Sequence, residues 1–99
     1  MRNREELIAG ATIVGVPDHL IGGLVEYIVV GRPVGQFLTA VLENDLMGAM
    51  SRADVHSAMG LRAVCTFLYS YAPGGCFGSQ ESVIDWYKKK NKEAAGYRK

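Results

Sequence analysis

The sequence predicts an all-α fold, a compact bundle of about four to five short helices. Its 99 residues fit the size of one domain, and 48% of them are hydrophobic, which is enough to offset the entropy of ordering a chain of this length. Apolar residues recur at helical spacing between stretches rich in glycine and proline. No segment shows the sustained alternation of a half-buried strand, apart from a doubtful stretch over residues 11–16.

The chain is expected to contain one central domain with a different segment at each end. Residues 1–15 are predicted to form an N-terminal arm or a short helix, because Gly10 and Gly15 weaken their periodicity. Residues 16–90 make up the helical domain, and residues 91–99 form a basic C-terminal tail.

The first helix of the domain is expected to open at Pro17 and to end at Gly31, where glycine suits a left-handed cap and Pro33 cannot continue the helix. Two alternatives fit the next stretch of helical spacing. It is either one helix bent near Gly48, or two short helices with Asp45 as the N-cap of the second.

The second half of the domain carries two further helical patterns. Asp54 suits the N-cap of a longer helix that ends at Tyr71, before the strong stop signal of residues 72–75. Ser79 then suits the N-cap of a last helix, which leads into the basic tail.

Composition and patterning exclude several classes of protein. No apolar run reaches the roughly 20 residues that a membrane span needs, so no membrane is expected as a partner. The N-terminus lacks the apolar region and cleavage site of a secretory signal, which predicts a cytoplasmic protein. The two cysteines, Cys65 and Cys76, are then expected to remain thiols without a structural disulfide.

Hydrophobic content and charge distribution suggest how the chain meets its partners. It is richer in apolar and aromatic side chains than a monomer of this size needs, which predicts a homo-oligomer.

The net charge is +5 from Trp86 onward and −4 over residues 1–85. No interleaved aromatic and basic face accompanies the lysines. They are interpreted as a solvated helix end, and nucleic acid is not expected as a partner.

The sequence predicts no metal centre and no catalytic array, and it implies no cofactor. The histidines and cysteines, which are His19, His56, Cys65 and Cys76, lack the paired spacing of a zinc site. Cys76 could act as a nucleophile only with a base beside it, and a small apolar residue in a turn is the better interpretation. We therefore expect a protein that is not an enzyme.

The glycine-rich loop over residues 74–79 is the first candidate binding feature. A loop of this kind that runs into a helix N-terminus presents backbone N–H groups and the positive end of the helix dipole, which together suit an anion. It lacks the lysine of a phosphate-binding Walker A loop, and a tight turn between helices explains it equally well.

A polar cluster over residues 43–45 and 52–54 is the second candidate. Asp45 and Arg52 lie seven residues apart, so they share a face if the helix is continuous. One interpretation makes Asp45 and Asp54 helix caps, with Asn44 in a turn and Arg52 paired to an acid. The other makes the cluster a recognition site that supplies a bidentate donor and directed acceptors.

The order of these motifs resembles a known pattern. Pro17-Asp18-His19, then Gly31, then residues 35–46, then Arg52-Ala53-Asp54, with Leu68-Tyr69, Pro73, Gly75-Cys76, Gly78-Ser79 and Trp86 further on, are similar to a family of small proteins of no assigned activity that tailed bacteriophages and prophages encode. The resemblance covers about residues 16–87. This sequence departs from the family's pattern at Glu26, where arginine is usual, and at His56, where asparagine is usual.

The resemblance implies a phage accessory protein in the host cytoplasm, such as a counter-defence protein that sequesters a small anionic ligand. A nucleotide signal, for example a cyclic nucleotide, is the expected ligand. Arginine and loop N–H groups would bind its phosphate, an amide or acid its base edge, and an aromatic ring its base. The expected contacts are Tyr27, Arg32, Asn44, Asp45, Arg52, Asp54, Gly75, Phe77, Gly78 and Ser79.

The alternative function is a protein–protein interaction module or inhibitor that acts on a host or phage protein. In that case the aromatic side chains and methionines would form an exposed apolar patch.

Overall fold

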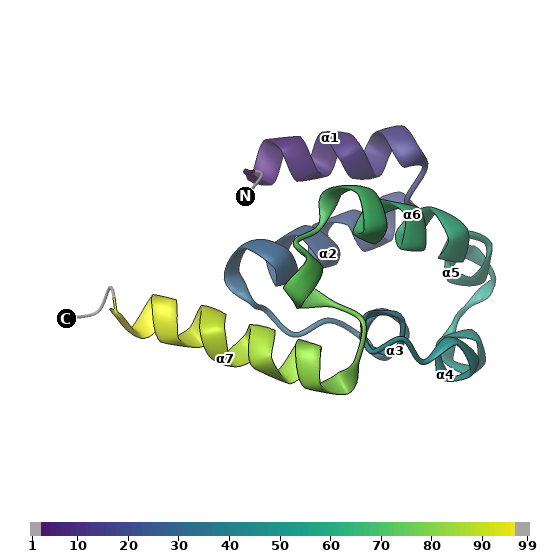
Figure 1. The fold of residues 1–99 in the computed structure, drawn as a ribbon. Helices are drawn as coiled ribbons and strands as arrows, with labels where there is room; N and C mark the ends of the chain where they lie inside the picture. Colours follow the sequence, from purple (N-terminus) through teal and green to yellow (C-terminus); the bar gives the residue numbers. More distant parts are fainter. Residues whose placement is uncertain (1–2, 97–99) are drawn as a thin grey trace.

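A computed structural model describes residues 3–96, which form seven α-helices, one short 3₁₀ turn and no strand (Figure 1). The all-α prediction is confirmed, but the helices are more numerous and shorter than expected. They are α1 (Arg4–Val14), α2 (Asp18–Val30), α3 (Gln36–Leu42), α4 (Leu46–Arg52), α5 (Val55–Met59), α6 (Leu61–Tyr71) and α7 (Gln80–Gly96), with the 3₁₀ turn η1 (Gly74–Cys76) between the last two.

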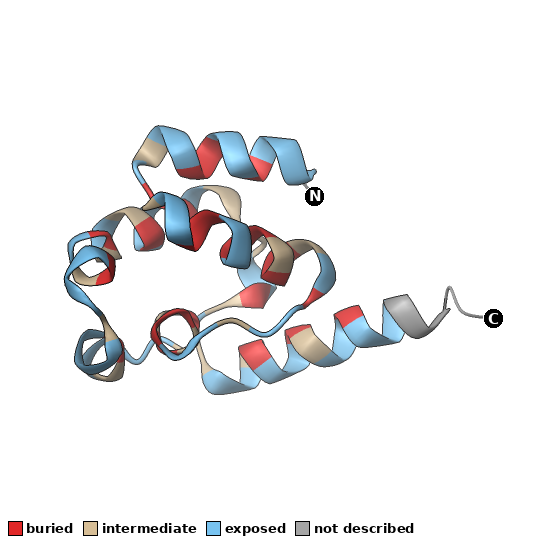
Figure 2. Cartoon of the chain, turned by 180° about the vertical axis from the view of Figure 1, so that it is seen from behind, coloured by how far each residue is buried: buried red, intermediate tan, exposed pale blue. Residues whose placement is uncertain are grey.

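The N-terminal segment is a helix and not a loose arm. Asn3 caps α1 in a reciprocal capping box with Glu6, and Gly15 ends it in the left-handed conformation. Its inner face buries Leu7 and Ala11, and the helix packs against α2 and α6. Figure 2 shows these buried turns on the side of α1 that faces the rest of the molecule.

Two breaks account for the additional helices. The first lies between α3 and α4, where Asn44 takes a positive φ of 63°. The Asp45 carboxylate then accepts a hydrogen bond from the Gly48 N–H and caps α4. Of the two alternatives, the one with two short helices and Asp45 as the N-cap of the second is confirmed. The second break lies at Gly60 and was not expected. The chain passes the Pro17 ring there so closely that a β-carbon on residue 60 would collide with it, and the single helix predicted to run from Asp54 to Tyr71 is divided.

The core is built around α2, most of whose residues are buried. Tyr27 lies at its centre with no exposed surface, and its hydroxyl donates a 2.7 Å hydrogen bond to the Cys76 carbonyl in η1. The Trp86 indole N–H of α7 donates to the Tyr27 carbonyl at 2.9 Å. One residue of α2 therefore anchors both the η1 turn and the last helix.

The last helix crosses the C-terminal end of α2 and then continues outward. Gly31 ends α2 with a φ of 73°, and a β-carbon there would press on the Lys90 side chain, so α7 packs closely at this point. Figure 1 shows the C-terminal end of α7 projecting beyond the other helices. Residues 91–96 continue this helix and do not form a separate tail, while residues 97–99 of the predicted tail lie outside the described residues.

Within residues 3–96, no helix is both long and apolar enough to cross a membrane.

Candidate functional site

The predicted binding residues do not converge on one site. Asp45 and Arg52 line a polar pocket, while Asn44, Phe77 and Gly78 line an apolar groove on another part of the surface. Gly75 lines a third, basic pocket, and the four remaining residues, Tyr27, Arg32, Asp54 and Ser79, line none of these three.

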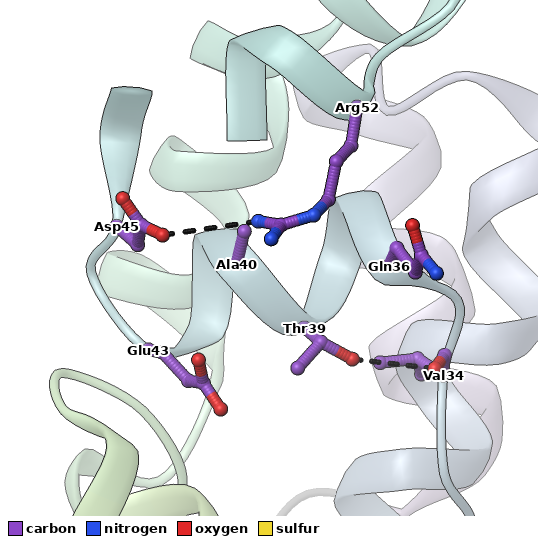
Figure 3. Close-up of a pocket in the computed structure, with 7 residues that line it drawn as sticks. All are labelled: Val34, Gln36, Thr39, Ala40, Glu43, Asp45 and Arg52. Atoms are coloured by element: carbon purple, nitrogen blue, oxygen red, sulfur yellow. Dashed lines mark hydrogen bonds and ion pairs between the residues drawn. The ribbon is translucent and has the colours of Figure 1, made fainter. Parts of the chain in front are cut away.

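The polar pocket forms where α3 meets the ends of α4, and it encloses about 330 Å³. Figure 3 shows the Arg52 guanidinium reaching across α3 toward Asp45, with Gln36 on its other side and Glu43 below. The Arg52 Nη1 atom lies 3.8 Å from the Asp45 carboxylate, and both side chains are about half exposed. The pairing of Arg52 with an acid was predicted from the sequence, whereas Gln36 and Thr39, which add an amide and a hydroxyl to the wall, were not.

The charge of the polar pocket is unfavourable for an anion. Among the described residues that line it, the two carboxylates of Glu43 and Asp45 outnumber the one guanidinium of Arg52. Asp45 also caps α4 through the Gly48 N–H, so one of its oxygens already has a structural partner. The capping interpretation of Asp45 is confirmed, whereas its role toward a ligand stays a prediction.

Tyr27 cannot stack on a ligand in this structure, because its side chain has no exposed surface. Burial raises the pKa of its hydroxyl well above the usual value, which keeps the buried hydrogen bond to Cys76 intact. Its expected role at a binding site is replaced by a role in the core.

Arg32 is exposed, and its Nε lies 3.9 Å from the Glu26 carboxylate. Glu26 also accepts a 2.7 Å hydrogen bond from Arg4, which is the main reason that its pKa is lowered. Two arginines thus surround one acid, and they link α1 to the end of α2 on the protein surface.

Asp54 caps α5 as expected, because its carboxylate accepts a 2.7 Å hydrogen bond from the Ser57 N–H. Bonds from the N–H and hydroxyl of Ser57 hold the pKa of Asp54 below its usual value. The buried Ser57 hydroxyl also lies 3.1 Å from the His19 ring, a pair that sequence spacing did not suggest. Ser57 therefore contacts both the Asp54 carboxylate and the His19 ring, which links the start of α5 to α2.

Several N–H groups at the glycine-rich loop and the helix start that follows already have hydrogen-bond acceptors within the protein. The Gly78 N–H donates to the Leu42 carbonyl at 2.7 Å. Ser79 caps the start of α7, where its hydroxyl oxygen accepts from the Ser82 N–H at 3.1 Å. The anion site expected at this helix N-terminus therefore loses two of its donors, and the turn interpretation fits the loop better.

The apolar groove holds the other part of this loop. Phe77 and Gly78 face Leu68 and Tyr69 of α6 across a space of about 280 Å³, with Asn44 at its edge. Its wall is mainly hydrocarbon and aromatic and carries no charged side chain among the described lining residues, so it does not attract an anion.

The basic pocket is larger, at about 540 Å³, and sequence reasoning found only Gly75 of it. It lies between the end of α6, the turn that follows and the middle of α7. Its wall combines Tyr71, Ala72, Pro73, Gly75, Trp86, Lys89 and Lys90. Trp86, Lys89 and Lys90 are spaced three and four residues apart, which places them on one face of α7.

Two ammonium groups lie beside the Trp86 ring. Lys89 Nζ is 5.2 Å and Lys90 Nζ is 4.8 Å from a ring centroid, both within the range of a cation–π interaction. The Lys90 side chain is only 8% exposed, and Glu93 accepts a 3.3 Å hydrogen bond from it. The interpretation of the lysines as a solvated face is wrong at Lys90, where the aliphatic stem packs at Gly31 and the ammonium group lies beside the Trp86 ring.

None of the described residues that line the basic pocket is acidic, and Lys89 is exposed at its edge. Trp86 and Lys90 are largely buried beneath this wall, so Lys89 is the cation most open to a ligand and Lys90 adds a second positive charge behind it. The helical spacing of Trp86, Lys89 and Lys90 could have been recognised in the sequence. The pocket itself forms only because α7 packs against the turn at Pro73.

The residues that could hold a metal are scattered. Across residues 3–96 there is no group of three or more histidine, cysteine or acidic side chains. Cys65 is exposed, Cys76 is buried, and both are free thiols.

The chain matches no protein-family model, no curated protein and no solved structure in the comparisons.

Proposed function

We propose that the protein is a non-enzymatic binding protein that takes up a small organic anion with an aromatic ring in its basic pocket. The observation that carries this proposal is the exposed Lys89, whose ammonium group lies 5.2 Å from the Trp86 ring centroid, at a 540 Å³ cavity with no acidic side chain among its described lining residues. The polar pocket, with more acids than bases, suits such a ligand less well.

A nucleotide is the ligand class that fits this wall best. Its phosphate would lie near Lys89, whose ammonium group is exposed, and its base would lie against the rings of the pocket. Cavities of about 300–1,000 Å³ are the usual size for ligands of this class, and the basic pocket falls in that range.

The proposed setting is the cytoplasm of a phage-infected cell, where the protein would sequester a nucleotide signal of host defence. The resemblance of residues 16–87 to phage-encoded proteins supports this setting. Sequestration needs binding without turnover, and a site of cations and aromatic rings provides binding groups but no paired acid and base.

A thermal-shift panel tests the ligand class. The expected result is that at least one nucleotide, cyclic or linear, stabilises the fold by about 2.7 kcal/mol at 100 times its Kd, while the matching nucleoside and inorganic phosphate are much weaker. Stabilisation by the nucleoside equal to that by the nucleotide would contradict the role of the lysines. No response to any nucleotide at millimolar concentration would contradict the proposal itself.

A second candidate function is protein–protein interaction, and one observation favours it. The three methionines among the described residues, Met47, Met50 and Met59, are all exposed, by 81%, 46% and 80%. Methionine is a flexible apolar side chain that is common at adaptable binding surfaces.

A further inference from the structure

Helices α4 and α5 carry their apolar side chains on the outside. Each of the two helices buries a single small residue, Ala49 in α4 and Ser57 in α5. Their large apolar residues are exposed instead, by 58% for Leu46, 81% for Met47, 46% for Met50, 72% for Val55 and 80% for Met59. We call these five residues the α4–α5 surface. This arrangement is the reverse of a surface helix that packs its apolar stripe inward.

The extent of this surface is close to that of a stable interface. The five side chains expose on the order of 600 Å², against roughly 800 Å² on each partner in a standard interface. Isolated exposed apolar residues are common on monomers, but half of the large exposed hydrophobic residues of the described chain lie in these 14 consecutive positions.

The charges around the surface suit pairing with an identical surface. Arg52 is the last residue of α4, and Asp45 and Asp54 are the N-caps of α4 and α5, so both signs of charge are present. A two-fold axis brings each residue of one copy to the reciprocal position on the other, so an acid and Arg52 can pair twice. The Asp45–Arg52 pair within one chain is loose, at 3.8 Å, and half exposed. The exposed lysines of α7, in contrast, would repel their own copies.

We infer that the α4–α5 surface is covered by the same surface of a second copy of this chain, which forms a two-fold homodimer. This inference goes beyond the proposed function, because it makes a second copy of the chain the partner of the exposed methionines, and it does not depend on the basic pocket, which lies on α6, the Pro73 turn and α7. It gives the expected homo-oligomer a defined interface.

Light scattering and sedimentation of the full chain, with three matched variants, test this interface. Met47→Glu and Met59→Glu place a charge at the two most exposed residues of the surface, and an apolar interface excludes such a charge. Ile13→Glu makes the same change at an apolar residue of α1 that is exposed by 76%, outside the surface. Because all three residues are exposed, the variants are expected to keep their helical circular dichroism, which is measured on the same samples.

The expected result at about 50 µM is a mass of twice 10.8 kDa for the wild type and for Ile13→Glu, and 10.8 kDa for the two methionine variants. A wild type of 10.8 kDa would overturn the inference and leave a different protein as the occupant of the surface. A dimer that persists in both methionine variants would also overturn it, because the interface would then lie elsewhere. Nucleotide binding is measured on the same variants, because the basic pocket lies elsewhere and the test of that pocket then stays separate from the test of the dimer.

Discussion

At the scale of single residues, buried polar groups determine how the last third of the chain meets the first. Tyr27 contributes its hydroxyl to the Cys76 carbonyl and its own carbonyl to the Trp86 indole. A buried polar group without a partner costs free energy, so these bonds favour one register of η1 and α7 on α2. The sequence identified Tyr27 as an aromatic residue of interest, but only its burial separates a core role from a ligand role.

Cys76 leads to a prediction about alkaline pH. Burial raises the pKa of its thiol to about 12, whereas an unfolded cysteine titrates near pH 8.5. Because the folded-state pKa is the higher one, the contribution of this thiol is fully present below about pH 8.5 and is lost as pH rises toward 12. The free energy of unfolding should therefore fall above pH 9, by at most about 1.4 kcal/mol per pH unit from this group.

Urea denaturation of the wild type and of Cys76→Ala at pH 8 and pH 10.5 measures this effect. The variant loses some stability at both values, because it removes a buried sulfur atom, but its loss between the two pH values should be smaller than that of the wild type. Cys65→Ala serves as the control, since Cys65 is exposed and its replacement should change the alkaline loss less. An equal loss in the wild type and Cys76→Ala would refute the assignment.

At the scale of helices, the signals that sequence reasoning found are local ones. The caps at Asp45 and Asp54, the glycine end at Gly31 and the stop at Pro73 depend on residues within one turn, so they could be predicted. The break at Gly60 depends on Pro17, which lies 43 positions earlier in the chain. No local pattern contains that contact, and the helix from Asp54 was therefore expected to be too long.

The candidate sites follow the same rule. Helical spacing predicted that Asp45 and Arg52 share a face if the helix is continuous, and that Arg52 pairs with an acid; the two side chains do pair, although Asp45 is the cap before α4. The basic pocket was missed, because it needs α7 to pack beneath the turn after α6. Three lysines in a row look like a solvated helix end until the burial of Lys90 is known.

Removal of an N-cap tests the account at this scale. Asp54→Ala should lower the free energy of unfolding by about 0.5–2 kcal/mol, because the Ser57 N–H loses its acceptor at the start of a five-residue helix. Asp85→Ala, which removes an exposed acid from α7, is the control and should change it by less than about 0.5 kcal/mol. Thermal and chemical unfolding followed by circular dichroism compare the two variants. An equal loss of unfolding free energy in Asp54→Ala and Asp85→Ala would contradict the capping role, because Asp54 would then contribute no more than an exposed acid does.

At the scale of the whole molecule, the lysines and the exposed methionines of the described chain lie on different helices. Lys88, Lys89, Lys90 and Lys92 lie on α7, whose C-terminal end projects from one end of a molecule 44 Å long. The exposed methionines lie on α4 and α5, toward the opposite end in Figure 1. One molecule can therefore bind an anion through α7 while another surface remains free for a second copy.

The central claim, that an anion binds beside Trp86, is tested most directly by the fluorescence of this residue. Trp86 is the single tryptophan of the sequence and lines the basic pocket, so its emission reports on a ligand there. A nucleotide that stabilises the fold is titrated into the wild type, Lys89→Ala, Lys88→Ala and Arg52→Ala. Lys88 is the matched control, because it is an exposed lysine next to Lys89 that does not line the pocket.

The account predicts that Lys89→Ala weakens binding at least about tenfold, which corresponds to about 1.4 kcal/mol, with no change in fold. Lys88→Ala and Arg52→Ala should retain the wild-type affinity to within about twofold, because Lys88 is an exposed, screened charge that does not line the basic pocket and Arg52 lies in the polar pocket. Equal weakening by Lys88→Ala and Lys89→Ala would show attraction to the basic helix without a site. Loss of binding in Arg52→Ala alone would place the ligand in the polar pocket and contradict the central claim.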